Sequence, residues 1–354
     1  MQITAKISGI KYTPLLCKKL KTFPLRDIEK VFLKESVFLL AIDNSNLFAI
    51  SRWVSPKRTR SYPYPRVYDT LSFSGKRVAV IPVIKDEGED GDRDFIQWDT
   101  IPLMSLLQVY VIITYYADAS PSSRSKNKIT SQKFSIDHIR FELERLTGYQ
   151  SDALHWNMKQ IERVDEVAEK AIRSYRIISE KLGIKMHSFE SALRRLEILK
   201  KGKKEFMSSS RDLSRKAQER ESVTSQPKEK LSEGAKAVIT ITNYLGGSYY
   251  FTVDEAYIDG RNLLLVEGKH TRKSELPKES DIKDGLLKMV LFSNLEEVMV
   301  GGREYSPLPI LKLTTGSGFN LEKLSLRERK VWERLKEEAE KNSFKIMLNG
   351  DFVV

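Results

Sequence analysis

Cysteine is almost absent from this chain of 354 residues, because Cys17 is the only one. A disulfide within one chain needs two cysteines and a cysteine-based zinc site needs more, so both are excluded. The four histidines are scattered and show no pairing at the spacing of a histidine metal site. These absences predict a reducing compartment, and we expect a cytoplasmic protein.

Long apolar runs are also lacking. The longest one, residues 101–116, contains Gln108 and falls short of the ~20 residues that a membrane-spanning helix needs. The first residues show no secretion signal, and no GxxxxGK[ST] segment for binding nucleotide phosphates occurs. We therefore expect no membrane partner, no secretion and no nucleotide cofactor.

Acidic residues are outnumbered by basic ones. The chain has 60 Lys and Arg against 48 Asp and Glu, which gives a formal net charge of +12. A basic protein binds polyanions well because each neutralised phosphate releases counterions. A membrane surface also carries negative charge, but no basic amphipathic segment here has the aromatic face that such binding uses. The charge balance favours a nucleic acid as the partner.

Residues 249–270, YYFTVDEAYIDGRNLLLVEGKH, are typical of a β-hairpin. Asp259 and Gly260 separate two runs that are rich in apolar, β-branched and aromatic residues, and Asp-Gly suits a two-residue hairpin turn. With these two residues as the loop, Asp254 on the first strand lies opposite Leu265 on the second.

This register predicts a shared face for Asp254, Glu267 and Lys269, because side chains alternate between the two faces of a strand. Two carboxylates and a lysine on a half-buried face are costly to desolvate unless a cation occupies them. Carboxylate oxygens suit Mg²⁺, so we expect Mg²⁺ as the cofactor, with Mn²⁺ able to substitute. The alternative is an edge hairpin whose charges only pair with neighbours, a contribution of about 0–1 kcal/mol.

Asp254, twelve intervening residues and then Glu267-Gly268-Lys269 resemble the D…(D/E)xK motif of the PD-(D/E)xK, or restriction-endonuclease-like, nuclease superfamily. The resemblance implies that Asp254 and Glu267 hold the metal and that Lys269 completes the catalytic set. It also implies an α/β (α+β) fold, with a restriction-endonuclease-like mixed-sheet core flanked by helices. No proline precedes Asp254, and this departs from the motif.

Further elements are predicted around the hairpin, in the order that such a core needs. They are a strand at residues 235–244, a helix at 281–292, closing strands at 297–301 and 310–315, and a helix at 321–342. Lys288 on the first helix and Lys273 in the loop before it are candidate DNA contacts. In the superfamily that the motif resembles, a polar or basic residue on this helix often supports the active site, so Lys288 is also a candidate for that role.

Residues 1–130 read as a β-rich N-terminal domain, a candidate for DNA recognition. Within them, residues 53–68, WVSPKRTRSYPYPRVY, interleave basic and aromatic side chains, and three prolines predict that the segment stays outside helices and central strands. Arginines bind phosphates or guanine edges, and tyrosines stack on bases. The candidate DNA contacts are therefore Lys57, Arg58, Arg60, Tyr62 and Arg66. The alternative is an ordinary exposed loop whose tyrosines pack on their own domain.

The polar residues 119–132 predict a linker at the end of this domain. Residues 131–230 read as a helical region with a basic, flexible linker, because apolar residues recur at spacings of three and four over residues 161–182. Residues 231–354 complete the chain as the nuclease domain with its C-terminal helix.

The function that these residues favour is a Mg²⁺-dependent type II restriction endonuclease, which hydrolyses phosphodiester bonds of double-stranded DNA at a specific sequence. Cutting both strands needs two such sites, so we expect a homodimer that reads a symmetric sequence. Two alternatives stay open: a PD-(D/E)xK repair or anti-phage defence nuclease acting on other nucleic acids, and a non-catalytic nucleic-acid-binding protein. The motif keeps all three of its charged groups, and this favours an enzyme.

Overall fold

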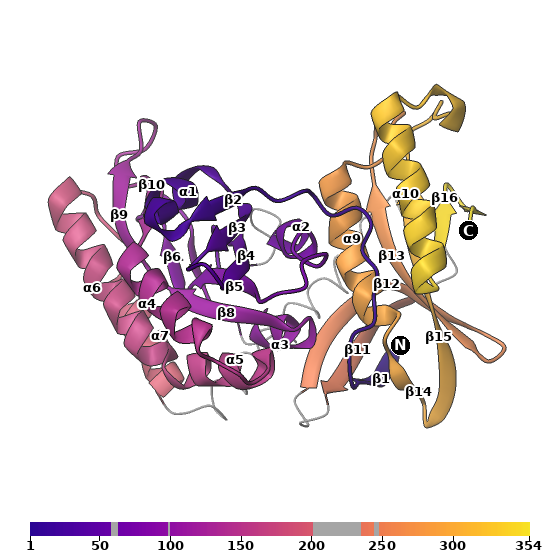
Figure 1. Cartoon of the computed structure of the whole chain (residues 1–354), viewed down its shortest axis with the longest axis horizontal. Coiled ribbons are helices and arrows are strands. Elements are labelled where there is room, and N and C mark those ends of the chain that lie inside the picture. Colours follow the sequence, from indigo (N-terminus) through magenta and orange to yellow (C-terminus); the bar gives the residue numbers. More distant parts are fainter. Residues whose placement is uncertain (58–62, 98–99, 201–234, 244–247) are drawn as a thin grey trace. The chain divides into compact units, whose positions relative to one another are not determined.

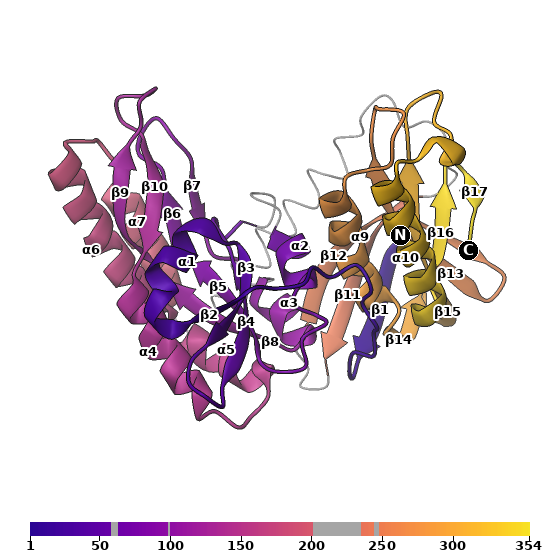
Figure 2. The same ribbon diagram turned by 45° about the horizontal axis from the view of Figure 1, so that its top comes forward.

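The structure, a computed structural model, describes residues 1–57, 63–97, 100–200, 235–243 and 248–354. The chain divides into two compact units: unit 1, which comprises Met1–Lys18 and Leu213–Val354, and unit 2, which comprises Lys19–Asp212. This division differs from the boundaries expected near residues 130 and 230, because the first strand of the chain belongs to unit 1. Figures 1 and 2 show the elements of each unit in two orientations.

Unit 1 is built on a mixed sheet with the strand order β13-β12-β11-β1-β14-β15-β16-β17. The strands are β1 (Gln2–Ile7), β11 (Ala235–Asn243), β12 (Ser248–Asp259), β13 (Asn262–His270), β14 (Glu296–Val300), β15 (Arg303–Thr314), β16 (Lys345–Leu348) and β17 (Asp351–Phe352). β13 also pairs with β15, so the six strands from β13 round to β15 form a closed circuit of pairings. The expected strands before and after the hairpin are therefore confirmed, and β13 lies between β12 and β15.

The hairpin of β12 and β13 is confirmed, but its register differs by two residues from the expected one. Asp259 pairs with Asn262, so the two loop residues are Gly260 and Arg261 rather than Asp259 and Gly260. Gly260 has a φ of 58°, a left-handed conformation that a residue without Cβ adopts at little cost. A shift of two residues leaves the paired side chains of the hairpin on their expected faces, because the alternation along a strand has a period of two.

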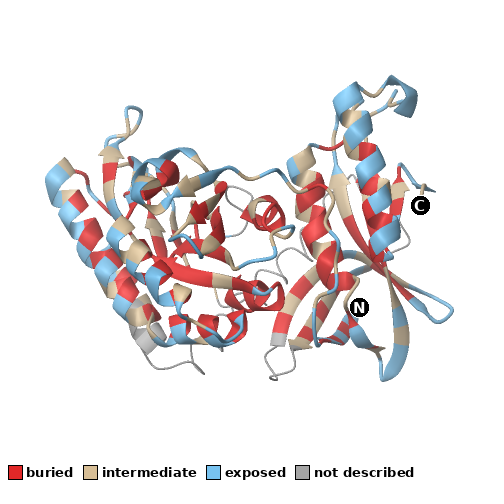
Figure 3. Cartoon of the chain, in the orientation of Figure 1, coloured by how far each residue is buried: buried red, intermediate tan, exposed pale blue. Residues whose placement is uncertain are grey.

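The helices of unit 1 pack on this sheet. They are α9 (Glu279–Phe292), which packs against β13 and β15, and α10 (Leu326–Asn342), which packs against β16 after a short 3₁₀ turn, η2 (Leu321–Lys323). The helix expected at residues 281–292 is thus confirmed, and Figure 3 shows that most of α9 is buried. α10 begins where Ser325 and Glu328 form a reciprocal capping box that satisfies free amides of its first turn.

The first residues of the chain are an integral part of unit 1. β1 runs parallel to β11 and antiparallel to β14, and it buries three apolar side chains, those of Ile3, Ala5 and Ile7. The segment after β1 is held by the buried carboxylate of Glu338 on α10, which accepts hydrogen bonds from the Tyr12 hydroxyl and the Leu15 amide, both at 2.8 Å. Strand pairing and this carboxylate together fix the segment to the sheet and to α10.

Unit 2 contains a mixed five-stranded sheet in the order β2-β3-β4-β5-β8 and two separate hairpins, β6–β7 and β9–β10. The strands are β2 (Thr22–Pro24), β3 (Val37–Ala41), β4 (Leu47–Arg52), β5 (Arg77–Pro82), β6 (Ile84–Asp86), β7 (Arg93–Phe95), β8 (Val109–Thr114), β9 (Tyr116–Pro121) and β10 (Ile129–Phe134). The helical elements are η1 (Leu25–Asp27), α1 (Ile28–Lys34), α2 (Pro63–Tyr68), α3 (Thr100–Leu106), α4 (Ile136–Thr147), α5 (Ala153–Glu162), α6 (Val164–Leu182) and α7 (Phe189–Lys200). Both units therefore combine helices with a mixed sheet, and the fold is α/β of the α+β kind.

The helices of unit 2 follow the apolar periodicity of the sequence. The pattern over residues 161–182 corresponds mainly to α6, which ends at Gly183 with a φ of 63°. The basic, flexible linker expected at the end of residues 131–230 lies outside the described residues, which omit 201–234. Within the part of the chain that the structure describes, no helix is both long enough and apolar enough to cross a membrane.

Two segments of unit 2 differ from their predictions. Residues 119–132 do not form a linker, since most of them belong to the β9–β10 hairpin, whose strands carry both buried and exposed side chains. Polar residues suit such a hairpin because one face of an antiparallel pair meets solvent. Residues 63–68 form helix α2 despite two prolines. Pro63 and Pro65 lie in its first turn, where backbone amides have no helical acceptor, so the missing donors cost little.

Candidate active site

A β-bulge in β12 sets the position of Asp254. Val253 pairs with Ala237 of β11, and Ala256 pairs with Ala235, so β12 contains one more residue than its partner between these pairs. An extra residue bends a strand and changes the direction of the side chains beside it. Asp254 therefore lies where the regular ladder of the sheet is interrupted.

The carboxylate of Asp254 bridges to the second strand of the hairpin. The last backbone pair between β12 and β13 is Glu255 with Val266. Beyond that pair, the amide of Gly268 donates to Oδ2 of Asp254 at 2.8 Å. The middle residue of the Glu267-Gly268-Lys269 motif thus holds Asp254 next to the motif.

Glu267 lies on β13 with its carboxylate between two ammonium groups. Its side chain is 3% exposed. Nζ of Lys269 lies 2.9 Å from Oε1, and Nζ of Lys288, which comes from α9, lies 2.5 Å from Oε2. Lys288 also donates to the backbone oxygen of Thr252 on β12, at 3.2 Å. Each oxygen of the buried carboxylate therefore faces one lysine.

Lys269 connects the motif to helix α9. Its ammonium donates to Oδ2 of Asp284 at 2.6 Å in addition to contacting Glu267. Its side chain passes close to Gly285, since a Cβ built on Gly285 would lie 3.1 Å from Cε of Lys269 and 2.7 Å from Cδ1 of Leu311. Contacts this short leave no room for a larger residue, so glycine lets α9 approach β13 and β15 closely.

The charged groups of the cluster shift one another's pKa values. Burial raises the pKa of Glu267, Lys288 and Lys269 oppose that rise, and Asp254 adds to it. Burial alone would lower the pKa of Lys269, but Glu267 and Asp284 outweigh it and raise the pKa above its ordinary value. The same opposition, with Glu267 and Asp254 as the partners, raises the pKa of Lys288. Both lysines are therefore positively charged at neutral pH.

If a hard divalent cation binds in this cluster, Asp254 and Glu267 are the carboxylates that would hold it. Oδ1 of Asp254 has no hydrogen-bond partner among the described residues, and Asp254 itself is exposed. The described residues contain no group of three or more His, Cys, Asp or Glu side chains arranged around a metal position. A cation here would thus take two carboxylates and complete its coordination with water and substrate oxygens, as Mg²⁺ commonly does.

The DNA contacts expected in residues 53–68 are only partly described. Lys57 is exposed, whereas Arg58, Arg60 and Tyr62 lie outside the described residues. Arg66 is directed inward, because its guanidinium donates to the backbone oxygen of Arg52 at 2.6 Å. The two tyrosines of α2, Tyr64 and Tyr68, are buried. Their burial agrees with the alternative in which the tyrosines of this segment pack on their own domain.

The two lysines expected to contact DNA in unit 1 differ from each other. Lys273 is 74% exposed and lies 3.4 Å from Glu275, so its ammonium is accessible to a ligand. Lys288 is 17% exposed and bound to Glu267, so its ammonium is less accessible to DNA. Both assignments as DNA contacts stay predictions.

Asp284 is the one member of this cluster that the sequence reasoning did not single out. Residues four apart on a helix lie on the same face, so Asp284 shares a face of α9 with Lys288. The spacing Asp284-x-x-x-Lys288, on the helix that follows the motif, is a signal that would have identified it.

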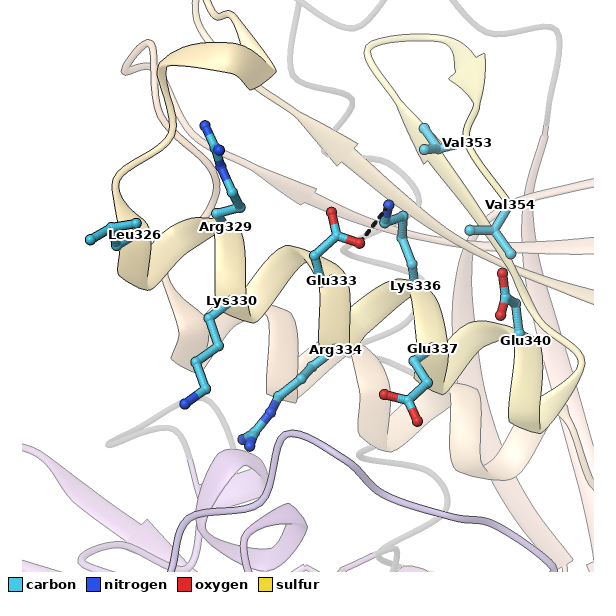
Figure 4. A pocket seen from close by; sticks show the side chains of 10 residues that line it. All are labelled: Leu326, Arg329, Lys330, Glu333, Arg334, Lys336, Glu337, Glu340, Val353 and Val354. Carbon is cyan, nitrogen blue, oxygen red and sulfur yellow. Dashed lines mark ion pairs between the residues drawn. The ribbon is translucent and has the colours of Figure 1, made fainter.

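A separate open groove lies along α10 and the last residues of the chain, with a volume of about 730 Å³. Figure 4 shows that side chains of both signs line it, and Glu333 and Lys336 pair there at 2.8 Å. None of the residues of the cluster described above lines this groove. Most of the groove side chains are exposed, whereas the cluster holds a buried carboxylate between two lysines, so the cluster is the candidate site.

Comparison with known proteins finds no relative. No protein-family model, no curated protein and no solved structure matches the chain. What the chain does is therefore inferred from the cluster of Asp254, Glu267, Lys269, Asp284 and Lys288.

Proposed function

We propose that the chain is a Mg²⁺-dependent nuclease of the PD-(D/E)xK kind, with a type II restriction endonuclease as the specific form. The observation that carries the proposal is the buried carboxylate of Glu267 beside Asp254, with Lys269 at 2.9 Å. A sheet that carries these groups, followed by a helix packed on it, is what the resemblance of the motif implies. The net positive charge of +12 supports a polyanionic substrate.

Asp254 and Glu267 would hold the metal in this proposal. When bound, Mg²⁺ neutralises charge on the phosphate and lowers the pKa of a coordinated water. The bulge and the Gly268 amide orient Asp254, and the burial of Glu267 excludes bulk water from its carboxylate. Two carboxylates fixed by different strands thus give a preorganised oxygen pair.

Lys269 acts as a charged group rather than as a base. Its raised pKa keeps the ammonium protonated at neutral pH, so it has no free lone pair to accept a proton from water. Held by Glu267 and Asp284, the ammonium is positioned to stabilise the negative charge that develops on the phosphate during hydrolysis. The surroundings of this lysine therefore support charge stabilisation rather than activation of the water by proton transfer.

Sequence-specific cutting of both DNA strands would require a homodimer with two such sites. Lys57 and Lys273 are the exposed candidates for DNA contact among the described residues. Recognition by unit 2 stays part of the proposal.

The test is incubation of the purified chain with a long unmethylated duplex DNA and Mg²⁺, followed by gel electrophoresis. Lys269→Met and Glu267→Gln remove one charge each at the site, and we expect either to lower the cleavage rate by at least ~10²-fold. Lys312→Gln is the matched control, because Lys312 forms a 2.8 Å ion pair with Glu255 outside the cluster. Discrete fragments from the natural chain and from Lys312→Gln, but not from the site variants, would support the restriction enzyme.

Other outcomes separate the alternatives. A smear that both site variants abolish would keep the nuclease and replace the restriction enzyme with a repair or defence nuclease. If the natural chain binds nucleic acid but cleaves no duplex, single strand or RNA with Mg²⁺ or Mn²⁺, the enzyme is excluded and a binding protein remains.

A further inference from the structure

The ammonium group of Lys288 occupies a position between the two strands that carry the proposed metal ligands. It donates to Oε2 of Glu267 on β13 at 2.5 Å and to the backbone oxygen of Thr252 on β12 at 3.2 Å. Thr252 is two residues from Asp254, whose charge also acts on Lys288. One cation is thus already built into the oxygen-lined space between β12 and β13.

The charges of the cluster leave room for one divalent ion. Three carboxylates, those of Asp254, Glu267 and Asp284, stand against the two ammonium groups of Lys269 and Lys288, which leaves one net negative charge. One divalent cation together with one phosphodiester anion brings this total to zero. A second divalent cation would leave two uncompensated positive charges in a partly buried site, where such charges are costly.

We propose that Lys288 takes the place of a second metal ion, so that the site binds one divalent cation per chain. This inference rests on the proposed function, because it assigns Asp254 and Glu267 as the ligands of that cation. Lys288 thereby occupies Oε2 of Glu267, and its ammonium supplies the positive charge that a second ion would otherwise bring.

The experiment is a titration of the full chain with Mn²⁺, read by calorimetry and by the electron paramagnetic resonance signal of free Mn²⁺, with an excess of dimethyl phosphate as the phosphodiester anion in place of DNA. We expect one Mn²⁺ per natural chain. Lys288→Gln and the nearly isosteric Lys288→Met each free Oε2 of Glu267 and add one net negative charge. With the phosphodiester anion bound, two ions then leave one uncompensated positive charge instead of two, so we expect the number of bound ions to rise to two. Lys288→Arg keeps the charge, and we expect it to bind one.

Lys312→Gln is the matched control for the loss of a paired lysine. Lys312 is 24% exposed and pairs with a carboxylate of β12, as Lys288 does with one of β13, but it lies outside the cluster. We expect it to bind one Mn²⁺, as the natural chain does. Circular dichroism spectra of all variants establish which of them fold. The number of Mn²⁺ ions bound to the natural chain tests the inference even if a variant does not fold.

Two results would overturn the inference: two Mn²⁺ ions bound to the natural chain, or one ion bound with unchanged affinity to a folded Lys288→Gln or Lys288→Met. Either result leaves the proposed function standing if the natural chain still cleaves DNA and Lys269→Met does not. Failure of the proposed function looks different. In that case either the natural chain binds no Mn²⁺ or Asp254→Asn binds Mn²⁺ equally well, and the natural chain cleaves no nucleic acid.

Discussion

Glu267 is buried between two lysines, an arrangement that contributes little to the stability of a fold. The desolvation of three charged groups offsets most of their mutual attraction, and apolar side chains of similar volume often stabilise as well or better. Two residues before Glu267 in the same strand, Leu265 is apolar and fully buried, as is Leu263 before it. The ionic cluster thus interrupts an otherwise apolar face of β13, which is common where a protein binds a ligand or catalyses a reaction.

Asp284 orients Lys269, and its replacement should slow the proposed reaction. Asp284→Asn keeps the size of the side chain but removes the negative charge that lies 2.6 Å from the ammonium. We expect the rate of DNA cleavage to fall about 10- to 100-fold, the usual effect of losing a residue that orients an active-site group. Steady-state kinetics with Mg²⁺ measure this, and Asp284→Glu should recover part of the rate.

A purely structural role for Asp284 is distinguished by the kinetic parameters. Asp284 contacts Lys269 and is assigned no contact with the substrate, so the loss in Asp284→Asn should fall on kcat while KM and the melting temperature change little. Asp281→Asn on the same helix is the control, and an unchanged kcat in a folded Asp284→Asn would contradict the assigned role.

The burial of His138 in unit 2 leads us to expect that the free energy of unfolding decreases in acid. Burial lowers the pKa of His138 below 6.5, although Glu142 opposes the effect, and its Nε2 lies 3.0 Å from the carbonyl oxygen of Ile113. Since the unfolded state then binds the proton more readily, the free energy of unfolding is largest above about pH 6.5 and falls as the pH decreases. Lys170 and Arg163 act in the same direction as burial.

Denaturant titrations at about pH 7.5 and about pH 5.5 measure this effect. The natural chain should lose more of its free energy of unfolding between the two than His138→Gln, which cannot titrate but keeps a hydrogen-bond donor. Equal losses in the two proteins would show that other groups cause the pH dependence.

The contact between α9 and β13 depends on Gly285, and a methyl group there should affect activity more than stability. In Gly285→Ala, the new Cβ meets Leu311 and Lys269 at 2.7 and 3.1 Å, so both side chains must move. Overpacking costs about 1–3 kcal/mol, and the better helix propensity of alanine offsets about 1 kcal/mol of it. We expect a small decrease in the melting temperature and a loss of cleavage of about 10-fold or more, since Lys269 is displaced.

Gly148→Ala is the matched control for this substitution. Gly148 ends α4 with a φ of −81°, and a Cβ there would meet nothing within 4 Å. We expect its activity and melting temperature to equal those of the natural chain. Full cleavage activity in a folded Gly285→Ala would show that the close approach of α9 does not position Lys269.

For single helices and strands, the sequence predicted which face each side chain lies on better than it predicted the register between strands. The Asp-Gly pair predicted the hairpin correctly but predicted the wrong loop residues. Asp254 and Glu267 still came together, because a shift of two residues preserves the faces on which paired side chains lie. The bulge beside Asp254 was not predictable, since it depends on how β12 pairs with β11. α2 was missed because proline opposes only the interior of a helix, and Pro63 and Pro65 lie in the first turn.

The whole molecule joins the two ends of the chain in one sheet, which no local pattern indicates. β1 pairs with β11 and β14, which follow it only after all of unit 2. Local periodicity identifies a strand but not its partner, because pairing is decided by burial across the completed sheet. The expected domain of residues 231–354 therefore lacked a strand that the structure places in the middle of the sheet.

This topology predicts that residues 213–354 are unstable without the first 18 residues. Removal of β1 exposes the edges of β11 and β14 and withdraws Ile3, Ala5 and Ile7 from the core, at about 1.5–3 kcal/mol for each of the larger two. Loss of Tyr12 and Leu15 also leaves the buried carboxylate of Glu338 without two of its donors. We expect the fragment to melt at a markedly lower temperature than the full chain or to aggregate.

Addition of a synthetic peptide of residues 1–18 supplies the missing strand and should raise the melting temperature of the fragment in proportion to the logarithm of its concentration. A peptide with Ile3→Asp and Ile7→Asp has the same length but places charges on the buried face of β1, so it should have no effect. Thermal unfolding followed by circular dichroism measures both. If the fragment alone unfolds cooperatively at a temperature that neither peptide changes, β1 is not an obligatory strand of the sheet, and the division expected from the sequence describes the folding unit better than the strand pairing does.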